Sequence, residues 1–470
     1  MRVQIHNVWS QAVEISREEE RWIDEFLSCP DRSYAARLRG ESMHHSYQRL
    51  TKAFPTGLLR PVVQEAARAS VAIEWEDLRV KPCEPESDED LMAWLRDYQK
   101  AAVRAVIQHG GRGLIKAPMA AGKTELMIGL ARMIPCIWLF LVHRSSIVRQ
   151  ILKRIVQRTG EDAGTFKGGL WQRQRSNVTV ATFQAVHHAL QRRTKGVREL
   201  IYDCEGIAVD EVHAQAAETF LGVTRSLENA YFRVGLSGTP LCRTAVDNIR
   251  TMGALGTLAF EVPYDLLVRR GLLSQSKVRM VEHRSIDLDP ASSWDEVYHQ
   301  GIVRCSSRNK LLAEIIMQAT HPSLVFVEEL EHGHRLMRRM EGKGLDVAFV
   351  HGDHSVYRRE EMIGDLVAGE LDVLICSVVF QEGIDIPSLR SVIVGTGKKS
   401  TVAVLQQIGR GMRVDVGKRA FDVWDIFDTG HDYLVRHSIM RQGAYEEGGH
   451  EPIVVPVSAL RGGTQQSLAI

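Results

Sequence analysis

Short apolar segments of β type recur along this chain, and helical stretches separate them. Between residues 91 and about 280 these segments are 113–116, 137–142, 178–181, 207–209 and 234–236. They are continuously apolar, which is typical of strands covered on both faces of a parallel sheet. The pattern starts again with 323–327, 347–350, 373–376, 391–394 and 421–425. The sequence therefore predicts an α/β fold of two consecutive parallel-sheet domains.

An acidic segment separates the amino-terminal part of the chain from these two domains. Residues 82–90 contain two prolines, a run of five acidic or polar residues at 86–90 and no apolar periodicity, which indicates a linker. We expect a small α+β domain at 1–81, the first α/β domain at 91–283 and the second at 284–446. The remainder, 447–470, is rich in Gly, Ser and Gln, and we expect a flexible tail there.

Composition restricts the class of protein. The chain has 470 residues, 44% hydrophobic and 25% charged, and a formal net charge of only +1, so nucleic-acid binding would require local basic patches. Its seven cysteines are scattered and include no Cys-x-x-Cys pair, which argues against a disulfide framework or a zinc module. The amino terminus lacks an apolar signal region and no run reaches ~18 apolar residues. We expect a cytoplasmic protein.

The segment Ala117-Pro-Met-Ala-Ala-Gly-Lys-Thr124 has the composition and context of a phosphate-binding loop. It follows a short β segment and precedes the helical stretch 125–132. Small residues let backbone N–H groups surround phosphates, and the helix amino terminus favours negative charge. Lys123 would reach the β- and γ-phosphates of ATP, and the Thr124 hydroxyl would ligate Mg²⁺. The expected nucleotide contacts are Ala120, Ala121, Gly122, Lys123, Thr124 and Glu125.

Two adjacent carboxylates, Asp210 and Glu211, follow the apolar segment 207–209. Asp210 is suited to hold the water shell of Mg²⁺, and Glu211 to polarise the attacking water. An acidic turn after a strand is the alternative for this segment alone. The phosphate-binding loop upstream favours the catalytic interpretation.

Arg410 and Arg413 follow Gln406 and Gly409 about two hundred residues further along the chain. Their spacing places them on one face if the segment is helical. Arginine stabilises the charge on a transferring γ-phosphoryl group, so delivery from the second domain would make hydrolysis depend on domain closure. The alternative is a solvated basic face.

From about 95 to 445 these motifs, in this order, resemble those of superfamily 2 helicases and translocases, whose motor is two RecA-like lobes. The resemblance implies that Arg96 and Gln99, in Leu95-Arg-Asp-Tyr-Gln99, bind the adenine nucleotide. It implies that His213 links the ATP site to Gln406, and that Ser237 and Thr239 couple hydrolysis to domain movement. Further along, Gly383 and Asp385 in Phe380-Gln-Glu-Gly-Ile-Asp-Ile-Pro387 are expected to face nucleotide and DNA.

The same resemblance suggests where the motor contacts DNA. Expected contacts lie in the segments that match the strand-binding motifs and in a loop after the 391–394 strand: Arg144, Thr182, Gln184, Lys398 and Ser400. For Lys398 and Ser400 an ordinary surface turn is the alternative.

Within the superfamily the chain looks most like the UvsW-type phage recombination helicases. The features that carry this likeness are a compact chain, the sequence Asp425-Ile-Phe-Asp428, and Tyr47-Gln-Arg-Leu followed by Phe54-Pro-Thr-Gly-Leu-Leu-Arg-Pro. The Arg-Glu-Asp element of XPB-type enzymes is absent after Ser237-Gly-Thr-Pro, and so is the Asp-Glu-Ala-Asp sequence of common RNA helicases.

The segment 32–60 combines basic and aromatic residues. Its members are Arg32, Arg37, Arg39, Arg49, Lys52 and Arg60, with Tyr34, Tyr47 and Phe54 between them and a single carboxylate, Glu41. This mixture favours contact with duplex or junction DNA. The alternative is a charged surface that has no partner.

The sequence therefore predicts an ATP-dependent DNA helicase or translocase with a small amino-terminal DNA-binding domain, two RecA-like lobes and ATP with Mg²⁺ as cofactors. The resemblance implies unwinding of branched DNA (forks, Holliday junctions, D- or R-loops) with 3′→5′ polarity, in recombination or repair. Three alternatives remain open: an RNA helicase, a duplex-DNA translocase subunit of a larger complex, and a nucleotide-gated protein that clamps or anneals DNA.

Overall fold

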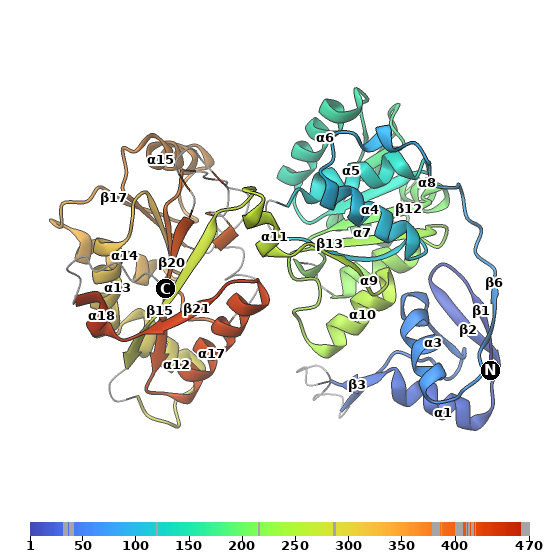
Figure 1. The fold of residues 1–470 in the computed structure, drawn as a ribbon, viewed down its shortest axis with the longest axis horizontal. Coiled ribbons are helices and arrows are strands. Elements are labelled where there is room, and N and C mark those ends of the chain that lie inside the picture. The colour runs from blue at the N-terminus through green and yellow to red at the C-terminus, as the bar shows by residue number, and fades with distance from the viewer. Residues whose placement is uncertain are drawn as a thin grey trace. The chain divides into compact units, whose positions relative to one another are not determined.

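The structure is a computed structural model. It describes residues 1–31, 36, 42–118, 121–214, 217–284, 288–377, 386, 388–399, 408–409, 411, 414, 418 and 420–461. The chain forms two compact units, Met1–Val262 and Pro263–Ile470 (Figure 1). The first unit contains the amino-terminal domain and the first lobe, and the second contains the second lobe. No helix among the described residues is long and apolar enough to cross a membrane.

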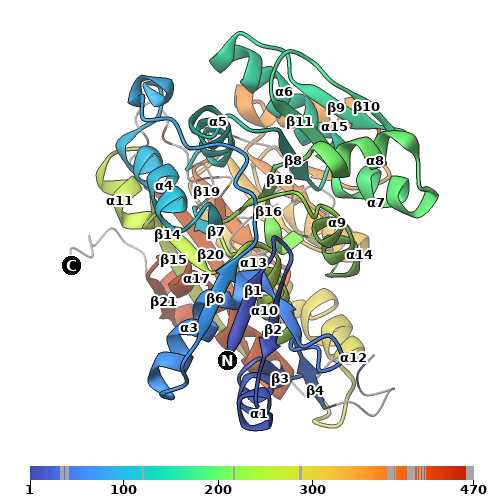
Figure 2. The ribbon, with the colours of Figure 1, turned by 90° about the vertical axis from the view of Figure 1, so that its right-hand side faces the viewer.

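The amino-terminal domain is a small α+β domain, as predicted. Its four-stranded sheet has the order β5-β2-β1-β6, with β1 antiparallel to β2 and parallel to β6 (Figure 2). The elements are β1 (Arg2–Ile5), β2 (Trp9–Glu14), α1 (Arg17–Phe26), β3 (Ser28–Pro30), β4 (Met43–His45), β5 (Ala53–Pro55), η1 (Thr56–Leu58), α3 (Leu59–Arg68) and β6 (Glu74–Asp77). Helix α1 begins at a capping box between Ser16 and Glu19, which satisfies its first backbone N–H groups.

Two aromatic residues that we expected to contact DNA lie instead in the core of this domain. Tyr47 is 2% exposed and Phe54 is fully buried, and both pack with Val3, Ile23 and other apolar residues. The prediction that these rings contact nucleic acid is therefore wrong, because a domain this small needs its large aromatic side chains for its own core. Of the basic residues in the same segment, Arg32, Arg37 and Arg39, like Tyr34 and Glu41, lie outside the described residues.

The first lobe has an eight-stranded sheet with the order β10-β9-β11-β8-β12-β13-β7-β14, in which only β9 and β10 pair antiparallel. The strands are β7 (Arg112–Lys116), β8 (Trp138–Val142), β9 (Gly164–Lys167), β10 (Leu170–Gln172), β11 (Val178–Thr182), β12 (Gly206–Asp210), β13 (Phe232–Ser237) and β14 (Leu258–Glu261). Between them run η2 (Glu89–Met92), α4 (Asp97–Gln108), α5 (Lys123–Met133), α6 (Ser145–Thr159), α7 (Phe183–Arg192), α8 (Lys195–Asp203), η3 (Val212–Ala214), α9 (Ala217–Ser226) and α10 (Ala245–Leu255). The five predicted strands are all present in this sheet.

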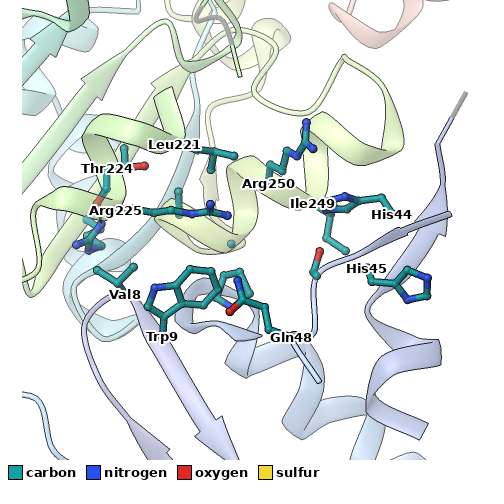
Figure 3. A pocket seen from close by; sticks show the side chains of 15 residues that line it. Val8, Trp9, His44, His45, Gln48, Leu221, Thr224, Arg225, Ile249 and Arg250 are labelled. Atoms are coloured by element: carbon teal, nitrogen blue, oxygen red, sulfur yellow. Dashed lines mark hydrogen bonds between the residues drawn. The ribbon is translucent and has the colours of Figure 1, made fainter. Parts of the chain in front are cut away.

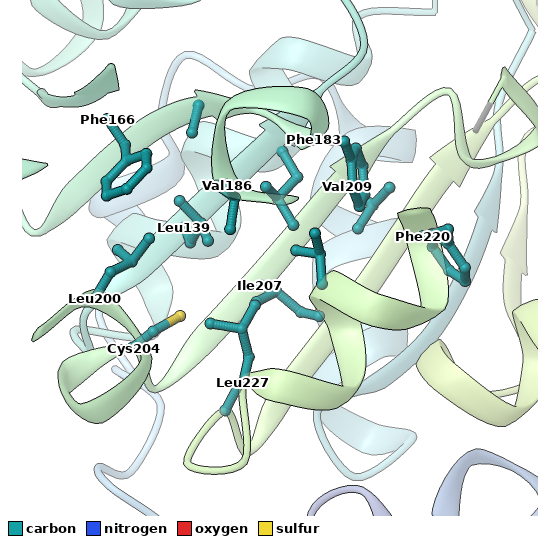
Figure 4. Packing of buried hydrophobic residues seen from close by; sticks show 14 of the residues in the cluster. Leu139, Phe166, Phe183, Val186, Leu200, Cys204, Ile207, Val209, Phe220 and Leu227 are labelled. Atoms are coloured by element: carbon teal, nitrogen blue, oxygen red, sulfur yellow. The ribbon is translucent and has the colours of Figure 1, made fainter. Parts of the chain in front are cut away.

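The main core of this lobe lies between the sheet and helices α7, α8 and α9 (Figure 4). Leu139 of β8 and the pair Ile207 and Val209 of β12 point to this face, and they meet Phe183 of α7 and Phe220 of α9. Alternate residues of a strand share a face, so Ala208 of β12 is left for the opposite side, where α5 contacts the strand. The strands are therefore buried on both faces, which explains their continuously apolar sequences.

The acidic segment 82–90 is held along the surface of the first lobe. The Glu86 backbone N–H donates to the Met133 carbonyl at 2.7 Å, and Arg104 of α4 forms an ion pair with Glu89. The linker therefore belongs structurally to the first unit.

The second lobe has a seven-stranded sheet with the order β17-β18-β16-β19-β20-β15-β21, and all its pairings are parallel. Its elements are α11 (Tyr264–Arg269), β15 (Gln275–Arg284), α12 (Trp294–Tyr298), η4 (His299–Val303), α13 (Ser306–Gln318), β16 (Ser323–Phe326), α14 (Leu330–Met340), β17 (Val347–Val350), α15 (Val356–Ala368), β18 (Val373–Cys376), β19 (Ser391–Val394), β20 (Ala420–Thr429), α17 (Asp432–Glu447), β21 (Pro452–Val455) and α18 (Val457–Arg461).

Two of the expected domain boundaries differ from the structure. Strand β15 pairs with β20 over ten residues, so 263–283 belong to the second unit and not to the first lobe. The expected flexible tail also contains structure, because β21 pairs with β15 and Leu460 of α18 is 6% exposed in the second core. Polar and apolar residues alternate in β15, and β21 and α18 are short. A search for long, continuously apolar segments therefore does not find them.

The sequence Asp425-Ile-Phe-Asp428 holds two buried arginines in the second lobe. Arg441 donates to Asp425 at 2.9 Å, and both side chains are fully buried. Arg308 makes a bidentate contact with Asp428, at 2.8 and 3.0 Å. Burial of an unpaired charge costs free energy. Each of these buried arginines therefore needs its carboxylate partner.

We predict that Asp425→Asn lowers the free energy of unfolding by about 3 kcal/mol, because it removes the carboxylate that accepts the Arg441 hydrogen bond and leaves Asp428, at 4.0 Å, as the nearby counter-charge. Denaturant unfolding of the full chain measures this loss. Asp265→Asn is the control, since Asp265 pairs with Arg269 at an exposed position and its loss should change stability little. Equal stability of Asp425→Asn and the native chain would contradict the structural role of this pair.

The amino-terminal domain packs closely against α10 of the first lobe. At Gly57 an added Cβ would lie 2.0 Å from the Met252 carbonyl oxygen, and at Gly253 it would lie 2.8 Å from Pro55. Asn7 also donates its side-chain amide to the Glu228 carbonyl at 3.0 Å, and Arg112 donates to the Asn7 carbonyl. The backbone of the amino-terminal domain is therefore in direct contact with the backbone of the first lobe.

We predict that Gly57→Ala weakens the packing of the amino-terminal domain on α10 and lowers the free energy of unfolding by about 1–3 kcal/mol. The added methyl group would displace either η1 or α10, since backbone atoms fill the space it needs. Gly364→Ala is the matched control, since nothing lies within 4 Å of that position in α15 and alanine favours a helix there. Denaturant midpoints of both variants test the prediction. A Gly57→Ala protein as stable as Gly364→Ala would show that the close approach is not needed.

Candidate nucleotide-binding site

The strand order of the first lobe brings three predicted motifs to one edge of the sheet. Strand β13 pairs in parallel with β12 on one side and with β7 on the other. Their carboxyl ends carry Asp210, Ser237 and the start of the phosphate-binding loop. The Ala117 backbone N–H donates to the Ser237 carbonyl at 2.8 Å and ties the loop to β13. In open parallel sheets this edge is where ligands bind.

The phosphate-binding loop ends in a glycine with left-handed backbone. Gly122 has φ of 82° and is the N-cap of α5, so the chain turns sharply and presents the backbone N–H groups of the first helical turn. Lys123 and Thr124 are the first two residues of that helix. Ala121 is 1% exposed and its N–H donates to the Pro118 carbonyl at 3.2 Å. Ala120 lies outside the described residues.

Lys123 and Glu211 form an ion pair across this edge. The lysine Nζ lies 2.7 Å from the Glu211 Oε1, with side chains 11% and 16% exposed. Burial lowers the pKa of Lys123, but the Glu211 and Asp210 carboxylates outweigh it, so its pKa lies above the ordinary value. Burial raises the pKa of Glu211, and the Lys123 ammonium group outweighs this effect and brings the pKa below its ordinary value. Both groups are therefore charged at neutral pH.

Glu211 has left-handed backbone, with φ of 49°, which is unusual for a residue with a side chain. Successive residues of a strand point to opposite faces, and this turn breaks the alternation directly after β12. Asp210 is 8% exposed as a residue, and its Oδ1 is buried without a hydrogen-bond partner among the described residues. Burial and the neighbouring Glu211 charge raise the pKa of Asp210 to about 6. A buried carboxylate oxygen with no donor fits a hydrated Mg²⁺ ion.

A chain of close contacts connects Glu211 to the end of β13. The His213 Nδ1 lies 2.6 Å from the Ser237 Oγ and 3.4 Å from the Glu211 Oε2. The Ser237 Oγ also accepts the Thr239 N–H at 2.9 Å. Burial lowers the pKa of His213, so the ring is neutral at physiological pH. The sequence predicted coupling roles for all three residues but missed the direct contact between His213 and Ser237. The predicted partner Gln406 lies outside the described residues.

Gln99, predicted to bind adenine, lies against the phosphate-binding loop. Its Nε2 donates to the Ala121 carbonyl at 3.0 Å, and its Oε1 accepts the Arg96 N–H at the same distance. The Tyr98 hydroxyl donates to the same Ala121 carbonyl at 2.9 Å and also contacts Arg96. The sequence did not single out Tyr98, although its position beside Gln99 at the start of α4 was visible.

Glu125, predicted to contact nucleotide, is engaged by α6. Its carboxylate accepts hydrogen bonds from Arg158 at 2.9 and 3.1 Å and forms an ion pair with Arg154 at 3.3 Å. These contacts join the first turns of α5 to α6. A nucleotide contact of Glu125 stays a prediction.

The predicted DNA contacts of the first lobe follow the strands that flank this edge. Thr182 ends β11 and caps α7, where its Oγ1 accepts the Ala185 N–H at 3.2 Å. Gln184 on α7 and Arg144, the N-cap residue of α6, are exposed. These three residues stay predicted contacts.

In the second lobe Lys398 is paired with an acidic residue. Its Nζ donates to Glu328 at 2.5 Å and lies 5.1 Å from the centre of the Tyr298 ring. Several predicted residues lie outside the described residues: Ser400, Gly383, Asp385, Arg410 and Arg413. Their roles stay predictions.

Comparisons with known proteins agree with this arrangement. Residues 93–241 match the family described as "Type III restriction enzyme, res subunit", and 307–415 match the "Helicase conserved C-terminal domain". A helicase of Sulfolobus islandicus filamentous virus is 26% identical over 75% of this chain and 67% of its own length. The ATP-dependent DNA helicase uvsW of Enterobacteria phage T4 is 24% identical over 79% of this chain and 82% of its own.

A solved structure shares the fold. The Type ISP restriction-modification enzyme LlaBIII, bound to DNA, aligns with a TM-score of 0.57 and 15% identity over 84% of this chain and 34% of its own. The two family matches cover the phosphate-binding loop, the acidic pair and much of the second lobe. The chain therefore belongs to the superfamily 2 helicases, with two RecA-like lobes, and it is similar to the UvsW-type group within them.

We predict that Asp210→Asn stabilises the nucleotide-free fold at alkaline pH while it removes a Mg²⁺ ligand. The folded pKa of about 6 exceeds the unfolded value of about 4, so the native chain loses stability as pH rises between them. Asparagine does not ionise, so the variant does not lose stability over this pH range. The variant should gain on the order of 2 kcal/mol over the native chain at pH 8 and little near pH 4.

Thermal or denaturant unfolding at both pH values measures this difference. Asp162→Asn is the control, since Asp162 is exposed in the same unit. A gain that is the same at pH 4 and pH 8 would contradict an ionisation effect at Asp210.

Proposed function

We propose that this chain is an ATP-dependent DNA helicase that remodels branched DNA with 3′→5′ polarity. The observation that carries the proposal is the pairing of Lys123 with Glu211 beside Asp210, at the sheet edge that also holds the phosphate-binding loop. Relatives whose names specify DNA, including the phage T4 helicase, support DNA as the substrate.

The ion pair supports a specific role for each charge. ATP brings its phosphates to the N–H groups of the first turn of α5, where the Lys123 ammonium group can move from Glu211 to the phosphate oxygens. This exchange frees the Glu211 carboxylate to accept a proton from the attacking water. Lys123 then serves binding and charge stabilisation, and Glu211 serves as the general base.

Asp210 and Thr124 are the residues that would hold Mg²⁺. Asp210 contributes its unpartnered carboxylate oxygen through the water shell, and Thr124 its hydroxyl from the first turn of α5. When bound, Mg²⁺ would neutralise the charge that develops on the β- and γ-phosphates. The cation would also relieve the repulsion between the adjacent Asp210 and Glu211 carboxylates.

The contact between His213 and Ser237 supports a route from hydrolysis to movement. Glu211, His213 and Ser237 lie in one chain of contacts, so a change at the Glu211 carboxylate reaches the end of β13. Thr239 follows two residues later and is tied to Ser237 by its backbone N–H. We infer that this segment senses the state of the nucleotide.

Steady-state ATP hydrolysis with different polymers tests the function. The arms are no nucleic acid, single-stranded DNA, forked or four-way DNA, and RNA, with Lys123→Ala as the inactive reference. We expect the strongest stimulation by branched DNA, followed by strand separation in an unwinding assay. Stimulation by RNA alone would make the chain an RNA helicase, and stimulation without strand separation would make it a translocase or clamp.

We predict that Glu211→Gln keeps ATP binding but lowers DNA-stimulated turnover by about 10²–10⁴-fold, because only the water-activating carboxylate is lost. Equilibrium binding of a fluorescent ATP analogue and steady-state turnover measure the two quantities separately. Glu199→Gln, at an exposed position on α8, should leave both unchanged. Turnover of Glu211→Gln within twofold of the native rate would refute the general-base role.

A further inference from the structure

A basic crevice lies where the amino-terminal domain meets the first lobe. Its walls come from β2 and β4 on one side and from α9 and α10 on the other (Figure 3). Arg225 on α9 extends into it above Trp9, Arg250 on α10 lines it with its guanidinium turned away from Trp9, and Trp9 and His44 line the opposite wall. None of the described residues that line the crevice is Asp or Glu. The positive charges of the crevice therefore lie on the wall that the first lobe forms.

The two arginines differ from Arg233, which also lines the crevice. The Arg233 guanidinium is buried and donates to the backbone carbonyls of Ala230, Thr224 and Leu227, so it is part of the structure of the lobe. Among the described lining residues no carboxylate is present to pair with Arg225 or Arg250, and the Arg225 guanidinium lies over the Trp9 ring. Their guanidinium groups are available to a ligand.

The charges in the crevice repel one another. Burial and then the Arg250 charge lower the pKa of Arg225, and the same two causes lower the pKa of His44. Asp31 acts on His44 in the opposite direction but less than Arg250 does. Arginine stays protonated in proteins, so the crevice keeps at least two positive charges without a compensating carboxylate among its described lining residues. An anion would relieve this repulsion.

The crevice is preformed. The amino-terminal domain is fixed on α10 by the close approach of Gly57 to the Met252 carbonyl and of Pro55 to Gly253. Trp9 holds the Arg225 guanidinium 5.0 Å from its ring centre, which orients that side chain at the mouth of the crevice. A ligand would therefore meet donors that are already positioned.

The crevice is separate from the ATP site. Strand β13 runs from Arg233, which lines the crevice, to Ser237, which lies at the ATP site. The two residues are four positions apart along the strand, which corresponds to about 13 Å. Phosphates bound at the crevice therefore cannot be those of ATP held by Lys123.

We propose that this crevice binds the phosphodiester backbone of a duplex arm of branched DNA, with Arg225 and Arg250 as the phosphate contacts. The inference rests on the proposed DNA substrate and adds a second contact at the far edge of the first lobe. Guanidinium groups suit phosphate oxygens, and the half-buried Trp9 suits the sugar beside them. The crevice would let the chain bind a junction more tightly than a single strand.

Equilibrium binding of the full chain to four-way DNA and to single-stranded DNA tests the proposal. We compare Arg225→Ala/Arg250→Ala with the native chain without nucleotide, over a series of salt concentrations. The double variant should bind four-way DNA roughly tenfold more weakly, and its plot of log affinity against log salt should lose about 2 from its slope, one for each phosphate contact. Single-stranded DNA should bind within twofold of the native affinity.

Two further variants serve as controls. Arg225→Lys/Arg250→Lys keeps the charge and should retain most of the salt slope, whereas Arg198→Ala removes an exposed arginine from α8 and should change neither quantity. Thermal unfolding verifies that each variant is folded. An unchanged slope and affinity in the double alanine variant, or an equal loss in Arg198→Ala, would overturn the crevice contact alone. Binding of RNA but not of DNA by the native chain would overturn both the contact and the proposed substrate.

Discussion

Parallel hydrogen bonding between β7, β13 and β12 determines where the reactive groups of the first lobe lie. Each strand delivers one motif, and parallel strands end at the same edge, so residues more than eighty positions apart become neighbours. The edge then collects Lys123, Asp210, Glu211 and Ser237. The left-handed backbone of Glu211 then places the carboxylate of this residue against the Lys123 ammonium group.

Charge burial follows different rules at the two lobes. In the second lobe Arg308 and Arg441 are matched by Asp428 and Asp425, so buried charge fixes the packing of β20 with α13 and α17. In the first lobe Asp210 is left beside a like charge, which raises its pKa and costs stability. The feature that marks this edge as a ligand site is the buried Asp210 oxygen, which has no hydrogen-bond partner among the described residues.

The sequence predicted the central strands of both sheets, because strands such as β8 and β12 are continuously apolar. It missed β15, whose polar and apolar residues alternate, the edge strands β10, β14 and β21, and β9, which pairs with β10. The ATP-site residues were recognisable because their spacing is local. The contact between His213 and Ser237 was not, since it depends on strand order, and the burial of Tyr47 and Phe54 depends on the core of a domain whose boundaries alone were visible.

The amino-terminal domain and the first lobe form one compact unit, and this has a mechanical consequence. Because Gly57 and Gly253 leave no room between the two parts, a ligand gripped by Arg225 or Arg250 moves together with the lobe that carries Lys123. A phosphate contact on a separate, mobile domain would let DNA slip while the ATP lobe moved. A contact formed where the amino-terminal domain packs on α10 instead transmits each displacement of the first lobe to the bound DNA.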